Sequence, residues 1–235
     1  MSFGFALAVP VAVSARATRP RRGPLGPVIA LLLLLLPALL LWAWDRDRML
    51  AAAARHGPRA VESVRALQRE LAAVQGADDL QRLARLNRFF NSQIAYAEDL
   101  DARGEVDHWA SPVESLARGL GDCEDYASAK YFGAIAAGVA PAKLRLVYVR
   151  AAMGGGARAH MVLAYTEKPG AQPLILDNLD GEIRPATERP DLTPVFSFNA
   201  EGLWQGTSGP AAGDAVSRLS RWRDLLAKAR AEGLF

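Results

Sequence analysis

The pentapeptide Gly121-Asp-Cys-Glu-Asp125 places the only cysteine of the chain among three carboxylates. A glycine followed by Asp122, a favourable N-cap residue, predicts that a helix begins here. Cys123 would then lie in the first helical turn, where free N–H groups and the helix dipole favour a thiolate. The same N–H groups could stabilise an oxyanion. The pattern indicates a cysteine nucleophile, although a buried structural cysteine at a helix start fits it too.

A thiolate nucleophile needs a general base, and the chain holds three histidines. His56 lies next to the Gly57-Pro58 breaker, and His108 lies in a loop. His160 starts the apolar run 160–166, whose composition is typical of a β-strand and would hold an imidazole rigidly. We therefore expect His160 to be the base. A strand-end histidine bonded to the backbone is the alternative.

A third group must orient the base and stabilise its cation. Asp177 lies in the otherwise apolar run Leu-Ile-Leu-Asp-Asn, and a buried carboxylate is costly unless it is paired. If the runs around His160 and Asp177 form neighbouring strands, the two side chains can pair across them. Cys123, His160 and Asp177 together predict a thiol hydrolase. Asp177 taken alone also fits a turn acid.

The acids around Cys123 conflict with its ionisation, because neighbouring negative charge raises the pKa of a thiol. A bound cation would offset this effect, and hard oxygen ligands at a loop–helix junction suit Ca²⁺. Three acids within four residues cannot all face one ion, so other acids or loop carbonyls would be needed. One cysteine and three scattered histidines argue against zinc. The residues alone leave metal binding open.

Hydrophobic periodicity predicts the elements that position these residues. Helices are expected over five ranges: 61–76, 79–94, 112–118, 122–138 and 214–232. Residues 100–112 have the composition of a loop. Short β-rich runs separated by Gly- or Pro-containing turns are expected at 144–150, 160–166 and 173–179. Helices followed by a meander of strands predict an α+β domain with an antiparallel sheet.

The N-terminal region has the pattern of an export signal. Several arginines precede the apolar run Leu25–Trp44, which as a helix is long enough to cross roughly 30 Å of hydrocarbon. Basic residues before the run place the body that follows outside the cytoplasm. We expect residues 1–48 to form a leader with a signal anchor or signal peptide, and residues 59–235 to form the globular domain. Leu41-Trp42-Ala43 is a poor cleavage site, which favours an uncleaved anchor over a cleaved signal peptide.

Composition and charge exclude several classes of protein. With 51% hydrophobic and 23% charged residues, the 235-residue chain differs from disordered, collagen-like and disulfide-rich proteins. Residues 1–59 hold eight Arg and two Asp, a net charge of +6, which leaves −3 for residues 60–235. Nucleic-acid binding needs basic residues clustered on the folded part. The slightly acidic body therefore predicts no nucleic-acid partner.

The chain carries the following motifs in order between residues 80 and 205: Asn87-Arg-Phe-Phe-Asn91, His108-Trp-Ala-Ser-Pro-Val-Glu114, Gly121-Asp-Cys-Glu-Asp-Tyr126, Lys130-Tyr131, His160-Met-Val-Leu163, Leu176-Asp-Asn-Leu179, Arg189-Pro-Asp-Leu192 and Phe196-Ser-Phe-Asn199. This set resembles the bacterial transglutaminase-like cysteine proteinases, the LapG-type periplasmic proteases. The resemblance implies a papain-like/transglutaminase-like cysteine proteinase fold, with a helical N-terminal part packed on the sheet. It also implies a Cys-His-Asp triad, which by motif position is Cys123, His160 and Asp177.

The resemblance further implies a calcium-dependent enzyme, whose ligands map onto Asp122, Glu124 and Asp125. The substrate of the family is a large cell-surface adhesin. It is cut near its N-terminus after paired alanines, which releases it and disperses the biofilm. An inner-membrane cyclic-di-GMP receptor of the LapD type restrains such proteases by sequestering them. An exposed tryptophan docks on that receptor; Trp109 is the nearest candidate, with a packed loop anchor as the alternative.

Together with the residues, the resemblance thus implies a periplasmic cysteine endopeptidase with Ca²⁺ as cofactor. It would be tethered to the inner membrane by its N-terminal segment, or secreted after signal cleavage. Two other functions are compatible with the same residues. One is acyl transfer onto an amine, as in transglutaminases, and the other is a non-catalytic periplasmic module that holds a peptide in its cleft.

Overall fold

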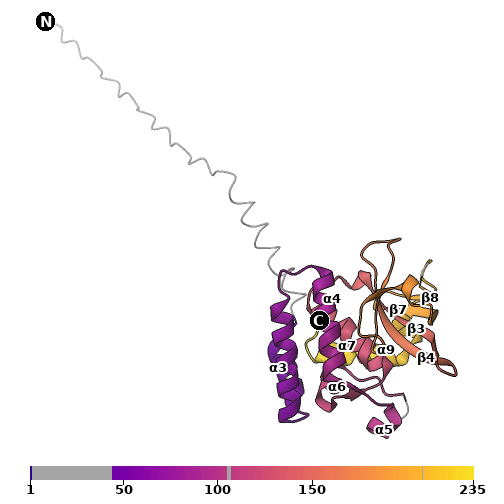
Figure 1. The fold of residues 1–235 in the computed structure, drawn as a ribbon. Coiled ribbons are helices and arrows are strands. Elements are labelled where there is room, and N and C mark those ends of the chain that lie inside the picture. The colour runs from indigo at the N-terminus through magenta and orange to yellow at the C-terminus, as the bar shows by residue number, and fades with distance from the viewer. Residues whose placement is uncertain (2–43, 105–106, 208) are drawn as a thin grey trace. The chain divides into compact units, whose positions relative to one another are not determined.

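The computed structural model describes residue 1 and residues 44–104, 107–207 and 209–235. Most of the predicted leader and anchor over residues 1–48 lies outside these ranges. Among the described residues, no helix has both the length and the apolar character that a membrane span requires. The described residues from Trp44 onward belong to one compact unit, whose ribbon is drawn in Figure 1.

The first half of this unit is helical. Its helices are α2 (Arg46–Ala54), α3 (Pro58–Ala73), α4 (Asp79–Gln93), α5 (Asp99–Arg103), α6 (Pro112–Arg118) and α7 (Cys123–Ala136). Periodicity predicted α3, α4, α6 and α7 within a few residues of these bounds. The range 100–112, expected to be a loop, contains most of α5. The packed region begins before residue 59, because Met49 and Ala53 of α2 are fully buried and the Asp45 N–H donates to the Gly233 carbonyl.

The second half holds a six-stranded sheet with the strand order β6-β5-β4-β3-β7-β8, antiparallel at each pairing. Its strands are β3 (Leu144–Met153), β4 (Gly156–Tyr165), β5 (Leu174–Leu176), β6 (Arg184–Pro185), β7 (Leu192–Phe198) and β8 (Leu203–Gln205). The three predicted strand runs correspond to β3, β4 and β5. β4 begins four residues earlier than predicted, because it pairs with β3 as far as Met153 and Gly156.

Two short strands lie apart from this sheet. β1 (Ala95–Tyr96) pairs in parallel with β2 (Leu120–Gly121), and this pairing brings the end of α4 beside the start of α7. Single-turn 3₁₀ helices occur at Pro141–Lys143 and Ala186–Glu188. The small parallel pair matters for the site, because it joins two segments that are distant in sequence.

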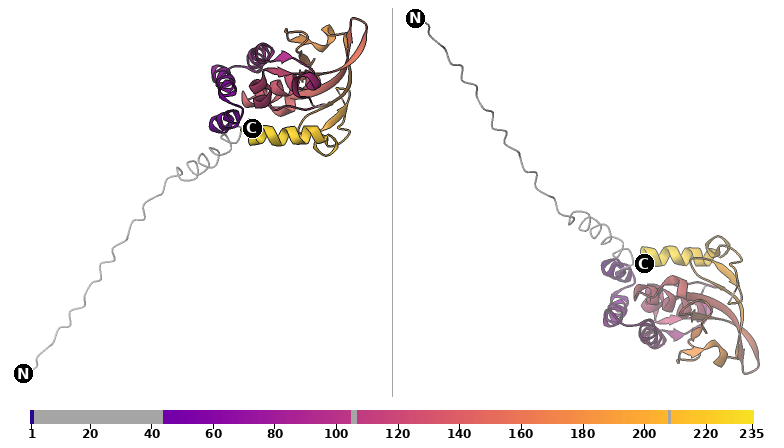
Figure 2. Two further views of the ribbon diagram at one scale, coloured as in Figure 1. Left: turned by 90° about the horizontal axis from the view of Figure 1, so that it is seen from below. Right: turned by 90° about the horizontal axis from the view of Figure 1, so that it is seen from above.

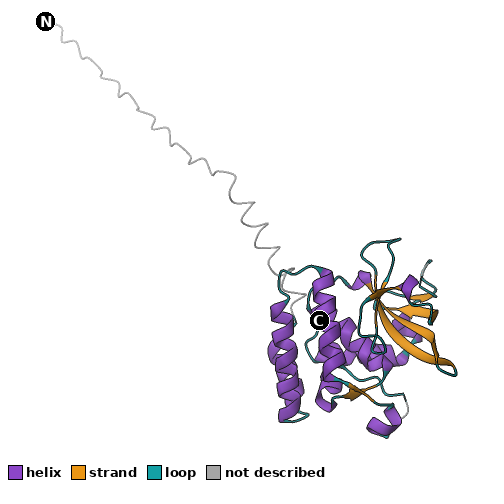
Figure 3. Cartoon of the chain, in the orientation of Figure 1, coloured by secondary structure: helices purple, strands orange, loops and turns teal. Residues whose placement is uncertain are grey.

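Helices and sheet form separate layers, as Figure 3 shows. α7 packs against β4 and is buried from Asp125 to Ala136, which explains why most of its residues are small or apolar with no polar face. The closing helix predicted over 214–232 is two helices, α8 (Ala215–Arg218) and α9 (Ser220–Ala231), because Leu219 is extended. α9, yellow in Figure 2, lies alongside α7, where Trp222 stacks on Phe132 with ring centroids 5.7 Å apart.

Candidate active site

A cavity of about 1070 Å³ opens where the N-terminus of α7 meets β4. Cys123 and His160 both line it. The helical part contributes β1, the turn before α7 and α5 to its wall, and the sheet contributes β3, β4 and β7. The predicted nucleophile and the predicted base therefore face one cleft, although they come from different layers of the fold.

Cys123 is the first residue of α7, as the sequence predicts. Its Sγ lies 3.0 Å from Oε2 of Glu124 and accepts a hydrogen bond from the Met161 N–H. Met161 directly follows His160, so this bond ties the sulfur to the strand that carries the imidazole. Burial, and after it the Glu124 carboxylate, raises the pKa of the Cys123 thiol above its ordinary value. The thiol as placed here needs help to ionise.

Asp122 occupies the N-cap position of α7, but its side chain makes no capping hydrogen bond. This differs from the expected capping role. The carboxylate lies instead in an acidic cluster with Asp99 and Glu124. The N–H groups of the first turn are consequently not occupied by the Asp122 side chain, which leaves the helix terminus available to a developing oxyanion.

His160 is buried within β4, and its Nε2 lies 2.8 Å from Oδ1 of Asp177. The prediction that His160 is the first residue of its strand is wrong, because the hairpin with β3 extends β4 back to Gly156. Asp177 is the first residue after β5, rather than a residue within it. Since Nε2 faces the carboxylate, Nδ1 is the ring nitrogen left to exchange a proton with a thiol.

Both carboxylate oxygens of Asp177 have protein donors. Oδ1 also accepts from the Leu179 N–H at 3.1 Å, and Oδ2 accepts from Nη2 of Arg189 at 2.8 Å. Burial alone would raise the pKa of Asp177, but the hydrogen bonds and charges of His160 and Arg189 lower it to about 2. Asp177 is therefore ionised at neutral pH.

The chain around Asp177 is held by two asparagines of α4. Nδ2 of Asn91 donates to the Asp177 carbonyl at 3.0 Å, and Nδ2 of Asn87 donates to the Gly181 carbonyl at 2.9 Å. One turn of helix separates the two asparagines, so both face the 177–181 segment and together fix its backbone. Asn87, Asn91 and Arg189 belong to the motifs of the sequence, but no role was predicted for them. Their presence in those motifs is the signal that could have marked them.

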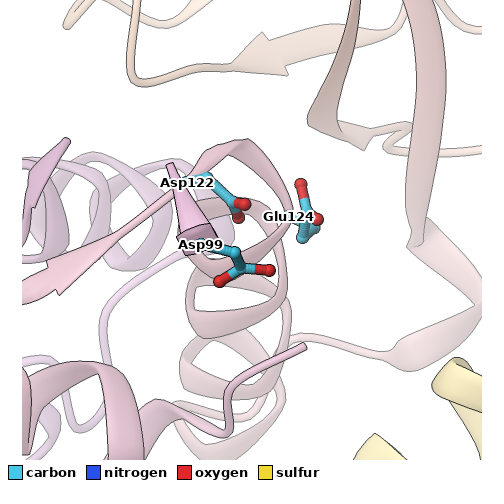
Figure 4. A group of neighbouring side chains, drawn as sticks. All are labelled: Asp99, Asp122 and Glu124. Carbon is cyan, nitrogen blue, oxygen red and sulfur yellow. The ribbon is translucent and has the colours of Figure 1, made fainter. Parts of the chain in front are cut away.

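Three carboxylates form a cluster beside Cys123. Oxygens of Asp99, Asp122 and Glu124 lie within 4.8 Å of one another, and Figure 4 shows these side chains turned toward a common point. Asp99 was not among the ligands predicted from the sequence. It reaches the cluster because β1 pairs with β2, where the Ala97 N–H donates to the Gly121 carbonyl at 3.0 Å.

Asp125, the third predicted ligand, is not one of these three acids. It is fully buried, and its Oδ1 accepts a hydrogen bond from the Ala110 N–H at 2.7 Å. Gly121 allows this packing, since a Cβ at that position would lie 2.8 Å from the Cβ of Asp125. The side chain of Asp125 thus joins α7 to the loop before α6.

The acidic cluster has the donor set of a calcium site. Oδ1 of Asp122 is buried without a hydrogen-bond partner. Burial, then the charges of Glu124, Asp125 and Asp99, raises the pKa of Asp122 to about 9. Acids this close repel one another unless they are protonated or share a cation. Carboxylate oxygens at such spacing suit Ca²⁺, which takes further oxygens from backbone or water.

The other two histidines do not line the cleft. His56 is exposed after α2, and His108 lies 3.7 Å from Oε2 of Glu114, near α9. Trp109, the candidate docking residue, is half-buried and lines the cleft. Its ring stacks on Phe198 with centroids 6.0 Å apart, as a packed loop anchor would.

Comparisons with known proteins identify the family and the fold. The family model for bacterial transglutaminase-like cysteine proteinases matches residues 59–191. Three solved structures of Legionella pneumophila LapG are each 35% identical to this chain, and each is covered over 98% of its length. The EGTA-treated form superposes with a TM-score of 0.70 over 79% of this chain.

The other two LapG structures superpose on this chain to a similar extent. A further structure of LapG and the calcium-bound form both superpose with a TM-score of 0.68, over 79% and 78% of this chain. The comparison with curated proteins found no match. The predicted fold class and the predicted resemblance are both confirmed. This chain belongs to the bacterial transglutaminase-like cysteine proteinases and has the fold of LapG.

Proposed function

We propose that this protein is a calcium-dependent cysteine endopeptidase of the periplasm. It cleaves the N-terminal region of a large cell-surface adhesin after paired alanines, which releases the adhesin and promotes biofilm dispersal. One observation carries the proposal: Cys123 at the tip of α7 shares a cleft with His160, whose ring is paired with Asp177. Membership in a cysteine proteinase family supports it.

In the proposed reaction, Nδ1 of His160 takes the thiol proton and the sulfur of Cys123 attacks the scissile carbonyl carbon. His160 then protonates the leaving amine, and water hydrolyses the acyl-enzyme. Asp177, bonded to Nε2, keeps the ring in the tautomer with Nδ1 as the reactive nitrogen and stabilises the imidazolium. The N–H of Cys123 contributes to the oxyanion hole.

Asp99, Asp122 and Glu124 would hold a calcium ion, with Asp125 adding its charge behind Asp122. When bound, the ion supplies positive charge that compensates the carboxylates beside the thiol. A calcium-bound structure exists for LapG of Legionella pneumophila, which supports the same cofactor here. Asp122 and Glu124 were expected ligands, and Asp99 joins them through the fold.

The rim of the cleft supports a polypeptide substrate. Large apolar side chains are exposed on both of its walls, at Tyr96 and Leu100 on the helical side and at Met153 and Leu179 on the sheet side. Such side chains are costly to leave in water unless they bind a partner. An extended protein segment can occupy both walls at once, which a small substrate cannot.

The proposed localisation and partners rest on the sequence. The protein would be periplasmic, held at the inner membrane by its N-terminal segment or secreted after signal cleavage. An inner-membrane cyclic-di-GMP receptor of the LapD type would sequester it. Trp109 is the proposed docking residue, but its stacking on Phe198 favours the role of loop anchor.

The test is cleavage of the N-terminal fragment of a co-encoded repeat adhesin, followed by mass spectrometry. Wild-type protein should yield two hydrolysed fragments, and Cys123→Ala should yield none while keeping the wild-type melting temperature. Added primary amine should not appear in the products. Amine-labelled product would favour acyl transfer instead, and fragment binding without any cleavage would favour a binding module.

A further inference from the structure

A buried arginine holds the carboxylate oxygen of Asp177 that His160 does not use. Nη2 of Arg189 donates to Oδ2 at 2.8 Å, while Nε2 of His160 lies 2.8 Å from Oδ1. The side chain of Arg189 is 6% exposed and that of Asp177 is 0% exposed. The two bonds engage opposite oxygens of one planar group, so together they fix its rotation about the Cβ–Cγ bond.

Arg189 is itself fixed by a second acid. Its Nε donates to Oδ1 of Asp191 at 3.0 Å, and its Nη2 donates to Oδ2 at 2.8 Å. This two-point contact sets the plane of the guanidinium, which a lysine ammonium could not match. Asp191, first, and Asp177 raise the pKa of Arg189 above its ordinary value, so the group is always charged.

The backbone at Asp177 needs such support. β5 ends at Leu176, so no strand pairing holds the acid itself, and its carbonyl accepts a hydrogen bond from Asn91 of α4. A buried carboxylate is also costly without a cation near it. Arg189 supplies this cation and holds the carboxylate of Asp177. It does so from outside the cleft, because it does not line the cavity that holds Cys123 and His160.

We propose that Arg189 is a positioning residue, which acts through Asp177 to keep His160 in its reactive orientation. This inference rests on the proposed function and adds a fourth member behind the triad. The resulting order of contacts runs from Asp191 through Arg189 and Asp177 to His160.

The first experiment measures kcat and KM on an internally quenched peptide that carries an Ala-Ala pair. Arg189→Gln should lower kcat about tenfold or more with KM within about twofold, because the loss lies in the orientation of the base. Arg189→Lys should recover part of kcat through its charge. Arg184→Gln is the matched control, since Arg184, on the adjacent β6, pairs with Asp180 and Glu182 but not with Asp177. It should leave kcat unchanged.

The decisive experiment is a double-mutant cycle with Asp177→Asn. If Arg189 acts through Asp177, adding Arg189→Gln to Asp177→Asn should change kcat by less than about twofold. The double variant also removes both charges of the buried Arg189–Asp177 pair; Asp191 loses its partner, but its side chain is 39% exposed and stays solvated. A further tenfold loss in that background would overturn the proposal.

Melting curves separate this role from a purely structural one. If Arg189→Gln does not fold, Asp191→Asn replaces it, because that change loosens the guanidinium while keeping it. Its kcat should fall a few-fold, with the same coupling to Asp177→Asn. A folded variant with unchanged kcat would refute the positioning role alone. A wild-type protein no more active than Cys123→Ala would instead refute the proposed function.

Discussion

Nε2 of His160 and Oδ1 of Asp177 lie 2.8 Å apart in a buried contact. The contact exists because β4 and β5 are neighbours in the sheet, and because Asp177 is the first residue after β5. An imidazole held in this way has one nitrogen committed to the carboxylate. The other nitrogen is the one that can serve the thiol of Cys123 across the cleft.

His160→Ala should therefore lower kcat/KM for peptide cleavage by about 10³-fold or more, since no other base is bonded to a carboxylate in this cleft among the described residues. His56→Ala and His108→Ala are the controls, because neither residue lines the cavity. Both should keep activity within a few-fold of wild type. A loss from His108→Ala as large as that from His160→Ala would mean that His160 is not the base.

Calcium should be required for activity and should bind the folded protein. EGTA is expected to abolish cleavage and added Ca²⁺ to restore it. Ca²⁺ should also raise the melting temperature, because a ligand that binds only the folded state stabilises it. Asp99→Asn should weaken both effects, since Asp99 is one of the three clustered acids.

Asp101→Asn is the matched control for that variant. Asp101 lies on the same short helix, α5, but it is exposed and outside the acidic cluster. Its calcium response should equal that of wild type. Equal responses from Asp99→Asn and Asp101→Asn would remove Asp99 from the ligand set, and a melting temperature indifferent to Ca²⁺ would count against the ion altogether.

Lys130 should destabilise the fold, and more so at lower pH. Its side chain is 1% exposed, its Nζ has no hydrogen-bond partner among the described residues, and it lies 5.7 Å from the centroid of the Tyr126 ring. Burial lowers the pKa of Lys130 to about 7, although the charge of Asp177 opposes this shift. Between that value and its ordinary pKa, the unfolded chain binds a proton that the folded chain does not. Stability therefore rises with pH across this window.

Lys130→Met should consequently increase the free energy of unfolding, by roughly 2 to 4 kcal/mol at pH 7 and by less at pH 9.5. Urea unfolding of both proteins at the two pH values measures this. Lys143→Met is the control, because Lys143 is partly exposed and pairs with Asp79, so its loss should destabilise slightly. A gain from Lys130→Met that is equal at both pH values would contradict the lowered pKa.

Substrate affinity should depend on the apolar rim of the cleft. Leu179→Ser is expected to raise KM several-fold with little change in kcat, because an exposed leucine contributes on the order of 1–2 kcal/mol when a partner covers it. The Leu179 N–H that bonds Asp177 is unaffected by this change. Leu80→Ser is the control, since Leu80 is equally apolar and exposed but does not line the cleft. Identical KM values for the two variants would show that the rim does not bind substrate.

Much of the local structure follows from the sequence alone. The apolar spacing along α3 and α4 depends on residues three and four apart, and the glycine and aspartate before Cys123 mark the start of α7. The candidate thiol, imidazole and carboxylate could be chosen in the same way, because few residues of those types stand in suitable patterns. The break at Leu219 escaped prediction, since its apolar spacing continues through the break.

Only the tertiary structure showed that Asp99 and Arg189 meet the other residues of the site. Asp99 joins the acidic cluster through a pairing of two-residue strands, which is too short to leave a periodic signal. Arg189 reaches Asp177 because the chain returns from β6 toward β7 past the end of β5. Local patterns act through neighbours along the chain. The contacts of Asp99 and Arg189 depend instead on strand order and packing across the whole domain, which no short stretch of sequence encodes.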